Sequence, residues 1–166
     1  MKQLYIDFDG VILDTMTKTY KILEEKGIDR KNSDEVIKFF RELDWQKLIS
    51  ETKEINDSIS EIKKICDSKK FNVYILTHIN STNEMVEKIK YLHKVLPQVT
   101  IVSVPKEIPK TEVVNASGAI LIDDYSENIR EWQKKLGIGI KFVKEYEGSV
   151  FPEITHLSDV IEMFNQ

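Results

Sequence analysis

The sequence of 166 residues has little cysteine and no long apolar run. Its single cysteine, Cys66, excludes an intrachain disulfide and lies in an apolar helical stripe, so we expect a buried thiol in a reducing cytoplasm. No apolar stretch approaches the length of a membrane span, and residues 1–3 lead straight into a predicted strand. We therefore expect neither a membrane segment nor a signal peptide.

Charge of one sign is not concentrated anywhere in the chain. The formal net charge is -4 and the lysine pairs are dispersed among acidic residues, so the chain offers no basic stripe to a nucleic-acid polymer. There are only three histidines and no cysteine cluster, which disfavours a zinc site. A content of 41% hydrophobic and 31% charged residues, without an internal repeat, is typical of one globular domain with a sizeable core.

Short apolar runs alternate with helical stripes along most of the chain. Capping boxes at Asn32 and Ser81 and glycine stops at Gly27 and Gly137 mark the expected helices. Strands alternating with helices predict an α/β fold, a doubly wound parallel sheet that binds ligands beyond the carboxyl ends of its strands. The runs expected to form buried strands are 4–6, 73–76, 101–104, 120–122 and, as an edge strand, 140–143.

The segment from residue 15 to residue 53 has the character of an insertion. A strand-helix-strand unit needs one helix between its strands, but several helical segments separate Asp14 from Phe71. We therefore predict a catalytic α/β core formed by residues 1–14 and 54–166, with residues 15–53 as a small helical cap.

Polar side chains follow three of the predicted strands at their carboxyl ends. Because these ends meet at one edge of a parallel sheet, the side chains are expected to converge on a single crevice. They are Asp7 and Asp9 after the first strand, Thr77 and His78 after the second, and Asp123 and Asp124 after the fourth, with Lys106 and Lys110 in the loop after the third.

This set of side chains indicates phosphoryl transfer. Adjacent carboxylates such as Asp7 and Asp9 repel each other unless a cation or a shared proton compensates, and several of them around one crevice suit Mg²⁺. A hydroxyl and an ammonium beside such a metal bind phosphate, so we expect a small phosphomonoester as the ligand. The candidate phosphate ligands are Thr77, Lys110 or Lys106, and the turn amides near Gly10.

Taken in order, these residues resemble the four motifs of the haloacid dehalogenase superfamily. The resemblance spans nearly the whole chain and implies a Rossmann-like core, a helical cap in the inserted position and a phosphatase with Mg²⁺ as its cofactor. The matching positions are Asp7-Phe8-Asp9-Gly10-Val11, Thr77, Lys110 and Asp123-Asp124.

The resemblance also implies a role for each matching residue. Asp7 would be the nucleophile that forms an aspartyl-phosphate, and Asp9 would be the general acid for the leaving oxygen and then the general base for water. Lys110 takes the place of the phosphate-binding lysine in preference to Lys106. The implied magnesium ligands are the Asp7 side chain, the Asp9 backbone carbonyl and Asp124, with Asp123 beside the ion, directly or through water.

Within the superfamily, residues 121–129, Trp132 and residues 137–140 are similar to the 5'(3')-deoxyribonucleotidase group. The chain has Leu136-Gly137 where that group usually has a glycine pair, and residues 78–80 lack its usual proline, so no nucleobase-binding residue is carried over. The leading substrate is a (deoxy)nucleoside monophosphate, followed by a sugar phosphate.

Several alternatives stay open at this point. The same residues suit a phosphomutase if the cap excludes water, and the same fold also suits a non-catalytic phospho-ligand or protein-binding module. His78 either touches the substrate or is a hydrogen-bonded structural residue, and Trp45 either stacks on the substrate or packs inside the cap. The oligomeric state is not predicted.

Overall fold

The fold is built on a six-stranded sheet in which every strand pairs in parallel with its neighbours, as the computed structural model of residues 1–165 shows. The strands are β1 (Lys2–Ile6), β2 (Phe71–Ile79), β3 (Thr100–Pro105), β4 (Ile120–Asp123), β5 (Ile138–Phe142) and β6 (Glu153–Ile154). Their order is β3-β2-β1-β4-β5-β6, so the chain starts in the middle and builds first to one edge and then to the other. The predicted α/β parallel sheet is confirmed, and its topological switch point lies between β1 and β4.

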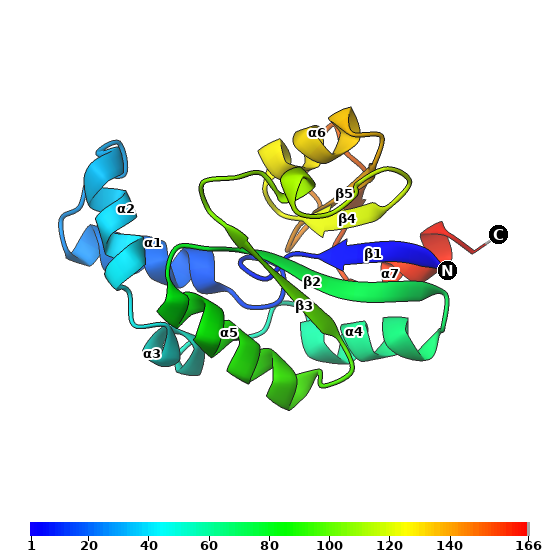
Figure 1. Cartoon of the computed structure of the whole chain (residues 1–166), viewed down its shortest axis with the longest axis horizontal. Coiled ribbons are helices and arrows are strands. Elements are labelled where there is room, and N and C mark those ends of the chain that lie inside the picture. The colour runs from blue at the N-terminus through cyan, green and yellow to red at the C-terminus, as the bar shows by residue number, and fades with distance from the viewer. Residues whose placement is uncertain (166) are drawn as a thin grey trace.

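Helices cover both faces of the sheet (Figure 1). The α-helices are α1 (Thr15–Glu25), α2 (Ser33–Glu42), α3 (Trp45–Ser50), α4 (Ser58–Asp67), α5 (Thr82–Val95), α6 (Ser126–Lys134) and α7 (Asp159–Met163), and a 3-10 turn, η1, spans Lys110–Glu112. Side chains of α4, α5 and α7 share the larger apolar cluster, whereas α6 packs on the opposite face over β4 and β5. Among residues 1–165, no helix has the length and apolar character that a membrane span requires.

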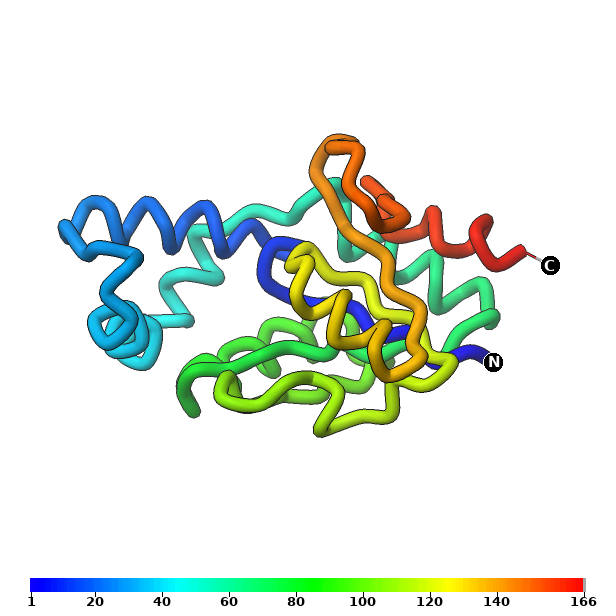
Figure 2. Tube along the Cα trace, turned by 90° about the horizontal axis from the view of Figure 1, so that it is seen from above, coloured from blue at the N-terminus to red at the C-terminus, as the bar shows by residue number. Residues whose placement is uncertain are grey.

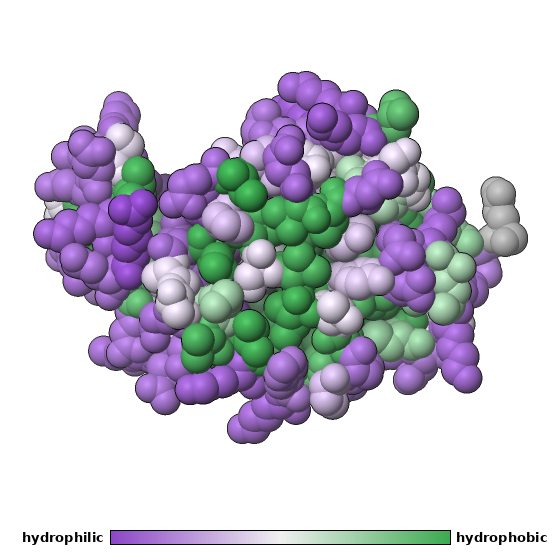
Figure 3. Space-filling view, in the orientation of Figure 1, coloured by the Kyte–Doolittle hydropathy of each residue, from purple (hydrophilic) through white to green (hydrophobic). Residues whose placement is uncertain are grey.

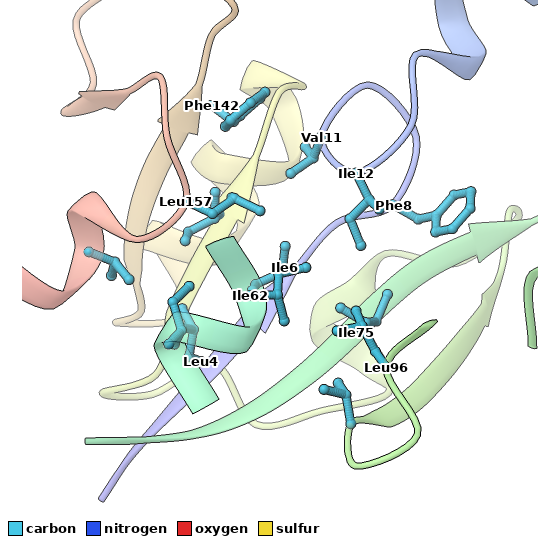
Figure 4. Close-up of a cluster of buried hydrophobic side chains, with 14 of the residues drawn as sticks. Leu4, Ile6, Phe8, Val11, Ile12, Ile62, Ile75, Leu96, Phe142 and Leu157 are labelled. Carbon is cyan, nitrogen blue, oxygen red and sulfur yellow. The ribbon is translucent and has the colours of Figure 1, made fainter. Parts of the chain in front are cut away.

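Alternation along β1 explains why both clusters form. Leu4 and Ile6 point to one face and Tyr5 to the other, and all three are buried. Figure 4 shows Leu4 and Ile6 in one cluster with Ile62 of α4 and Ile75 of β2. Burial on both faces is why the strands read as continuous apolar runs.

Part of the segment predicted as an insertion, residues 15–53, extends away from the sheet. Figure 2 shows α1 and α2 at the end of the molecule opposite the two termini. By contrast, α3 lies against α5, where the side chain of Asn83 accepts a 3.1 Å hydrogen bond from the backbone N–H of Trp45. Trp45 is buried at this junction, so at least one helix of the insertion is attached to the core.

The prediction that residues 140–143 form the edge strand is wrong. β5 lies between β4 and β6, with Lys141 paired to Glu153 and Phe142 to Ile154. β6 has only two residues, which is too short to produce an apolar run or an alternation that a sequence pattern could identify. The edge on this side is therefore a short strand, as is common at the edges of natural sheets.

The turn after α6 places a leucine in an unfavourable backbone conformation. Leu136 has φ of 64° and is 78% exposed, so no packing compensates for the strain of a side chain in the left-handed region. The following Gly137 is needed for space, because a Cβ there would lie 2.2 Å from Cδ1 of Trp132.

We predict that Leu136→Gly stabilises the protein by about 1 kcal/mol, because glycine adopts this conformation without strain. For a domain of this size, that is a rise in melting temperature of about 2–4 °C. Leu136→Ala keeps a Cβ in the same conformation and should bring no comparable gain. Thermal unfolding of the three proteins checks the expectation, which an unchanged or lower melting temperature for the glycine variant would contradict.

Candidate active site

Three carboxylates meet at the switch point of the sheet. Asp7 continues β1, since its N–H donates to the carbonyl of Ile122 in β4 at 3.0 Å. The register that pairs Ile6 with Ile122 places Asp7 beside Asp123 at the end of β4. Asp7, Asp123 and Asp124 each offer a carboxylate oxygen, and these oxygens lie within 4.8 Å of one another.

The loop after β1 is shaped to admit Asp124. Gly10 has φ of +76°, and a Cβ at this position would lie 2.2 Å from Oδ2 of Asp124. The amide of Gly10 donates to the carbonyl of Leu13 at 2.9 Å, so in this structure that amide serves the loop itself. What Gly10 contributes here is the space that lets the carboxylate of Asp124 approach the chain.

Lys110 joins two of the carboxylates. Its Nζ lies 2.7 Å from Oδ1 of Asp7 and 2.7 Å from Oδ2 of Asp123, and its side chain is 2% exposed. Burial alone lowers the pKa of Lys110, but the carboxylates of Asp123 and Asp7 raise it above the usual value. Lys106 is exposed and lines the cleft in front of the site, so the structure brings Lys110, and not Lys106, into contact with Asp7.

When its three carboxylates are ionised, the cluster has more negative charge than its one ammonium balances. The pKa of Asp7 is raised to about 7, mainly by burial and secondly by the charge of Asp123. The pKa of Asp124 is raised to about 9, mainly by burial and secondly by the charge of Asp7. Within residues 1–165, Asp124 forms no hydrogen bond or ion pair, whereas Asp123 accepts from the amide of Tyr125 and the side chain of Asn128. An oxygen-only donor set with excess negative charge fits a divalent cation such as Mg²⁺.

Asp9 lies in a separate network of side chains. Thr15 donates to its Oδ1 at 2.6 Å, and Lys88 donates to its Oδ2 at 2.7 Å. Lys88 also donates to Oγ1 of Thr77 at 2.9 Å and forms a buried ion pair with Glu84. Thr77 and Asp9 are thus brought together through a lysine rather than by direct contact.

Sequence reasoning missed Lys88, and it used Glu84 only as the second residue of the capping box that begins at Ser81. Ser81 does accept the N–H of Glu84 at 3.0 Å, as a capping box requires, but the Glu84 carboxylate turns to Lys88 and Asn80 instead. A signal was present, because Glu84 and Lys88 lie eight and four residues, respectively, before the buried Leu92, on the same face of α5.

His78 borders the cleft as a neutral side chain. Its Nε2 lies 2.9 Å from the carbonyl oxygen of Ile108, which requires this nitrogen to carry the proton. Burial lowers the pKa of His78 to about 4, outweighing the opposite effect of the carbonyl. His78 therefore makes the hydrogen bond expected of a structural residue, and it also lines the cleft.

A cleft of about 460 Å³ opens in front of these residues. Asp7, Asp9 and Asp124 form its floor, and side chains of residues 15–53 line the opposite part. The other lining residues are His78, Asn80, Glu84, Lys106, Tyr125 and Asn128. Figure 3 shows the molecule hollowed between the lobe formed by α1 and α2 and the core. The lining residues from the insertion include Thr15, Met16, Thr19, Tyr20, Leu23, Arg30, Val36, Phe40 and Trp45.

Comparison with known proteins identifies the fold. No protein-family model matches the chain, and no curated protein matches it. Among solved structures, a haloacid dehalogenase (HAD) phosphatase from Thermococcus onnurineus is similar with a TM-score of 0.64 at 16% identity, covering 98% of this chain and 97% of that one. A HAD hydrolase from Bacillus subtilis bound to magnesium has a TM-score of 0.64 at 14% identity, covering 99% of each chain.

A third similar structure, D,D-heptose 1,7-bisphosphate phosphatase from Burkholderia thailandensis, has a TM-score of 0.60 at 9% identity and covers 100% of each chain. The chain therefore has the Rossmann-like fold found in hydrolases and phosphatases of the haloacid dehalogenase superfamily. Asp7, Asp123, Asp124 and Lys110, which the sequence assigned to three of the expected motifs, lie together in this structure.

The raised pKa values make the stability of the metal-free protein depend on pH. An aspartate in the unfolded chain has a pKa of 3.8 and loses its proton above that pH. In the folded protein Asp7 keeps its proton up to about pH 7, and Asp124 keeps its proton up to about pH 9. Stability therefore falls as the pH rises through this range. A bound cation favours the ionised carboxylates and should reverse the loss.

We predict that Asp124→Asn raises the melting temperature of the chelator-treated protein at pH 8, because it removes one buried carboxylate from the cluster. In the wild type, MgCl₂ should raise the melting temperature, and in the variant this increase should disappear. The matched control is Asp67→Asn, an exposed carboxylate at the end of α4, which should keep the magnesium effect. A magnesium effect that survives in Asp124→Asn would remove Asp124 from the cation site.

Proposed function

We propose that the protein is a Mg²⁺-dependent phosphomonoester hydrolase that acts through an aspartyl-phosphate on Asp7. The observation that carries this proposal is the buried contact of Lys110 with Asp7, 2.7 Å between Nζ and Oδ1, at the floor of a cleft of about 460 Å³. A carboxylate held by a fixed ammonium at the floor of a cleft is poised both to attack a phosphorus atom and to tolerate the incoming negative charge. The fold shared with HAD phosphatases supports the same reaction class.

The residues present fit a magnesium ion. The Asp7 and Asp124 side chains and the Asp9 backbone carbonyl would hold it, with Asp123 beside it. When bound, Mg²⁺ supplies the positive charge that reduces the repulsion between a carboxylate nucleophile and a phosphate.

In the first half of the reaction, Asp7 attacks the phosphorus atom of the substrate. Lys110 binds Oδ1 of Asp7, so Oδ2 is the oxygen left to form the new bond to phosphorus. The bond between phosphorus and the leaving oxygen breaks, and Asp9 gives that oxygen a proton. Lys110 and the hydroxyl of Thr77 balance the charge on the other phosphate oxygens.

In the second half, a water molecule attacks the phosphorus atom of the aspartyl-phosphate. Asp9 accepts a proton from the water, the acyl-phosphate bond breaks, and inorganic phosphate leaves with the Asp7 carboxylate restored. Thr15 and Lys88 hold both oxygens of Asp9, which keeps this carboxylate oriented as a proton acceptor.

The substrate proposed for the site is a small phosphomonoester, with a (deoxy)nucleoside monophosphate ahead of a sugar phosphate. The cleft volume of about 460 Å³ is in the range of small-molecule sites. Tyr20, Phe40 and Trp45 line it, which suits a planar leaving group, and Arg30 lies 3.8 Å over the ring of Tyr20. In this proposal residues 15–53 are the cap that selects the leaving group.

The decisive assay is a panel of nucleoside monophosphates, sugar phosphates and aryl phosphates, each with Mg²⁺ and with a chelator. We predict turnover that requires Mg²⁺, with the highest kcat/KM on a nucleoside monophosphate. Asp7→Asn, an isosteric change at the nucleophile, is the matched control, and its loss of activity excludes a contaminating phosphatase.

Two results would count against these proposals separately. Absence of turnover on the whole panel, or equal turnover with the chelator, would refute the metal-dependent phosphatase. Turnover with equal kcat/KM on nucleotides and unrelated phosphates, or a strong preference for sugar phosphates, would refute only the nucleotide substrate.

A further inference from the structure

We propose that Lys88 is a positioning residue that orients both Asp9 and Thr77 for the reaction, an inference that rests on the function proposed above. Its side chain is 1% exposed, and four protein oxygens already engage its ammonium, whereas Asp9 lines the cleft. Lys88 therefore acts on a substrate through its neighbours and not by contact.

The ammonium of Lys88 is fixed from four sides. Besides the carboxylate of Asp9 at 2.7 Å and the hydroxyl of Thr77 at 2.9 Å, it contacts the carbonyl of His78 at 3.0 Å and the carboxylate of Glu84 at 2.5 Å. An ammonium has three N–H donors, so four oxygens share them and no direction is left unoccupied. The rings of Phe8 and Trp45 lie 5.0 and 4.7 Å away and close the remaining space.

For Asp9, this arrangement fixes the plane of the carboxylate. Lys88 holds Oδ2, and Thr15 holds Oδ1 from the start of α1. The side chain of Asp9 is 20% exposed at the cleft, where a carboxylate without such contacts rotates freely. Proton transfer requires an oriented oxygen, so the contact with Lys88 acts on the step that Asp9 carries out.

For Thr77, the contact determines which way the hydroxyl donates. Because Lys88 donates to Oγ1, that oxygen is already an acceptor and the hydroxyl proton must point elsewhere. In the structure it points to the carbonyl of His78 at 3.2 Å, a long hydrogen bond that a phosphate oxygen can replace.

The anchor for Lys88 is Glu84, one turn earlier on α5. Oε2 of Glu84 binds the ammonium, and Oε1 accepts from the backbone and side-chain nitrogens of Asn80 at 2.8 and 3.0 Å. A buried ion pair of this kind generally gives no more stability than apolar residues of the same size. Because the Glu84–Lys88 pair links α5 to Asp9 and Thr77, we infer that its role is to orient these two side chains.

The test compares wild type, Lys88→Met, Asp9→Asn and the double variant on an alkyl and an aryl phosphate with Mg²⁺. Methionine keeps most of the length of the side chain and removes the ammonium. We expect Lys88→Met to lower kcat on the alkyl phosphate by about 10- to 100-fold, the range found when supporting residues of a site are removed. The loss on the aryl phosphate should be smaller, since its leaving oxygen needs less protonation, and the loss should shrink when Asp9 is already asparagine.

Lys90→Met is the matched control, because Lys90 lies on the same helix and is exposed, and it should keep wild-type kinetics. Circular dichroism and melting temperature establish that each variant is folded. If Lys88→Met does not fold, the Glu84→Gln/Lys88→Met variant leaves no unpaired buried charge and should give the same dependence on the leaving group.

The positioning role is overturned if a folded Lys88 variant keeps wild-type kcat on the alkyl phosphate, or loses the same factor with and without Asp9. Either outcome leaves the phosphatase function standing. A wild-type protein that is inactive on both substrates overturns the function and this inference together.

Discussion

The contact between the ammonium of Lys110 and the carboxylates of Asp7 and Asp123 is the interaction on which the rest of the site depends. The parallel register of β1 and β4 brings these carboxylates together whatever their charge, and burial removes the water that would screen them. One buried ammonium at 2.7 Å from each lowers the repulsion but does not cancel it. The fold thus creates a place where one further positive charge is favourable.

The two aspartates of the first loop have different environments although only Phe8 separates them. Asp7 faces Lys110 and two other carboxylates, whereas Asp9 faces Lys88 and the hydroxyl of Thr15. Different surroundings allow one site to give two carboxylates two tasks, and the tasks proposed here are attack on phosphorus for Asp7 and proton transfer for Asp9. Each aspartate has its own buried lysine, and the two lysines come from opposite sides of the loop, one from η1 and one from α5.

Much of this arrangement could be predicted from the sequence because strong patterns encode it. The buried strands are continuous apolar runs, and the carboxylates follow directly where those runs end. The two runs, 4–6 and 120–122, were therefore enough to predict that Asp7 and Asp123 lie close together. Gly10 was predicted as a turn, although not as the space that Asp124 occupies.

What the sequence did not predict depends on contacts between distant segments. Glu84 and Lys88 share the face of α5 that carries Leu92, but their contacts with Asp9, Thr77 and Phe8 join segments that are far apart in the sequence. Strand β6 pairs through two residues, which leave no periodic pattern. These are tertiary effects that override local propensity.

The proposed mechanism depends on phosphorylation of Asp7 during turnover. It is tested most directly by quenching the wild-type protein with acid during turnover of a radiolabelled phosphomonoester in the presence of Mg²⁺, and locating the label by peptide mass spectrometry. We predict phosphate on the peptide that contains Asp7, and none in Asp7→Asn. Rapid turnover without any labelled peptide, or label on another residue, would contradict it.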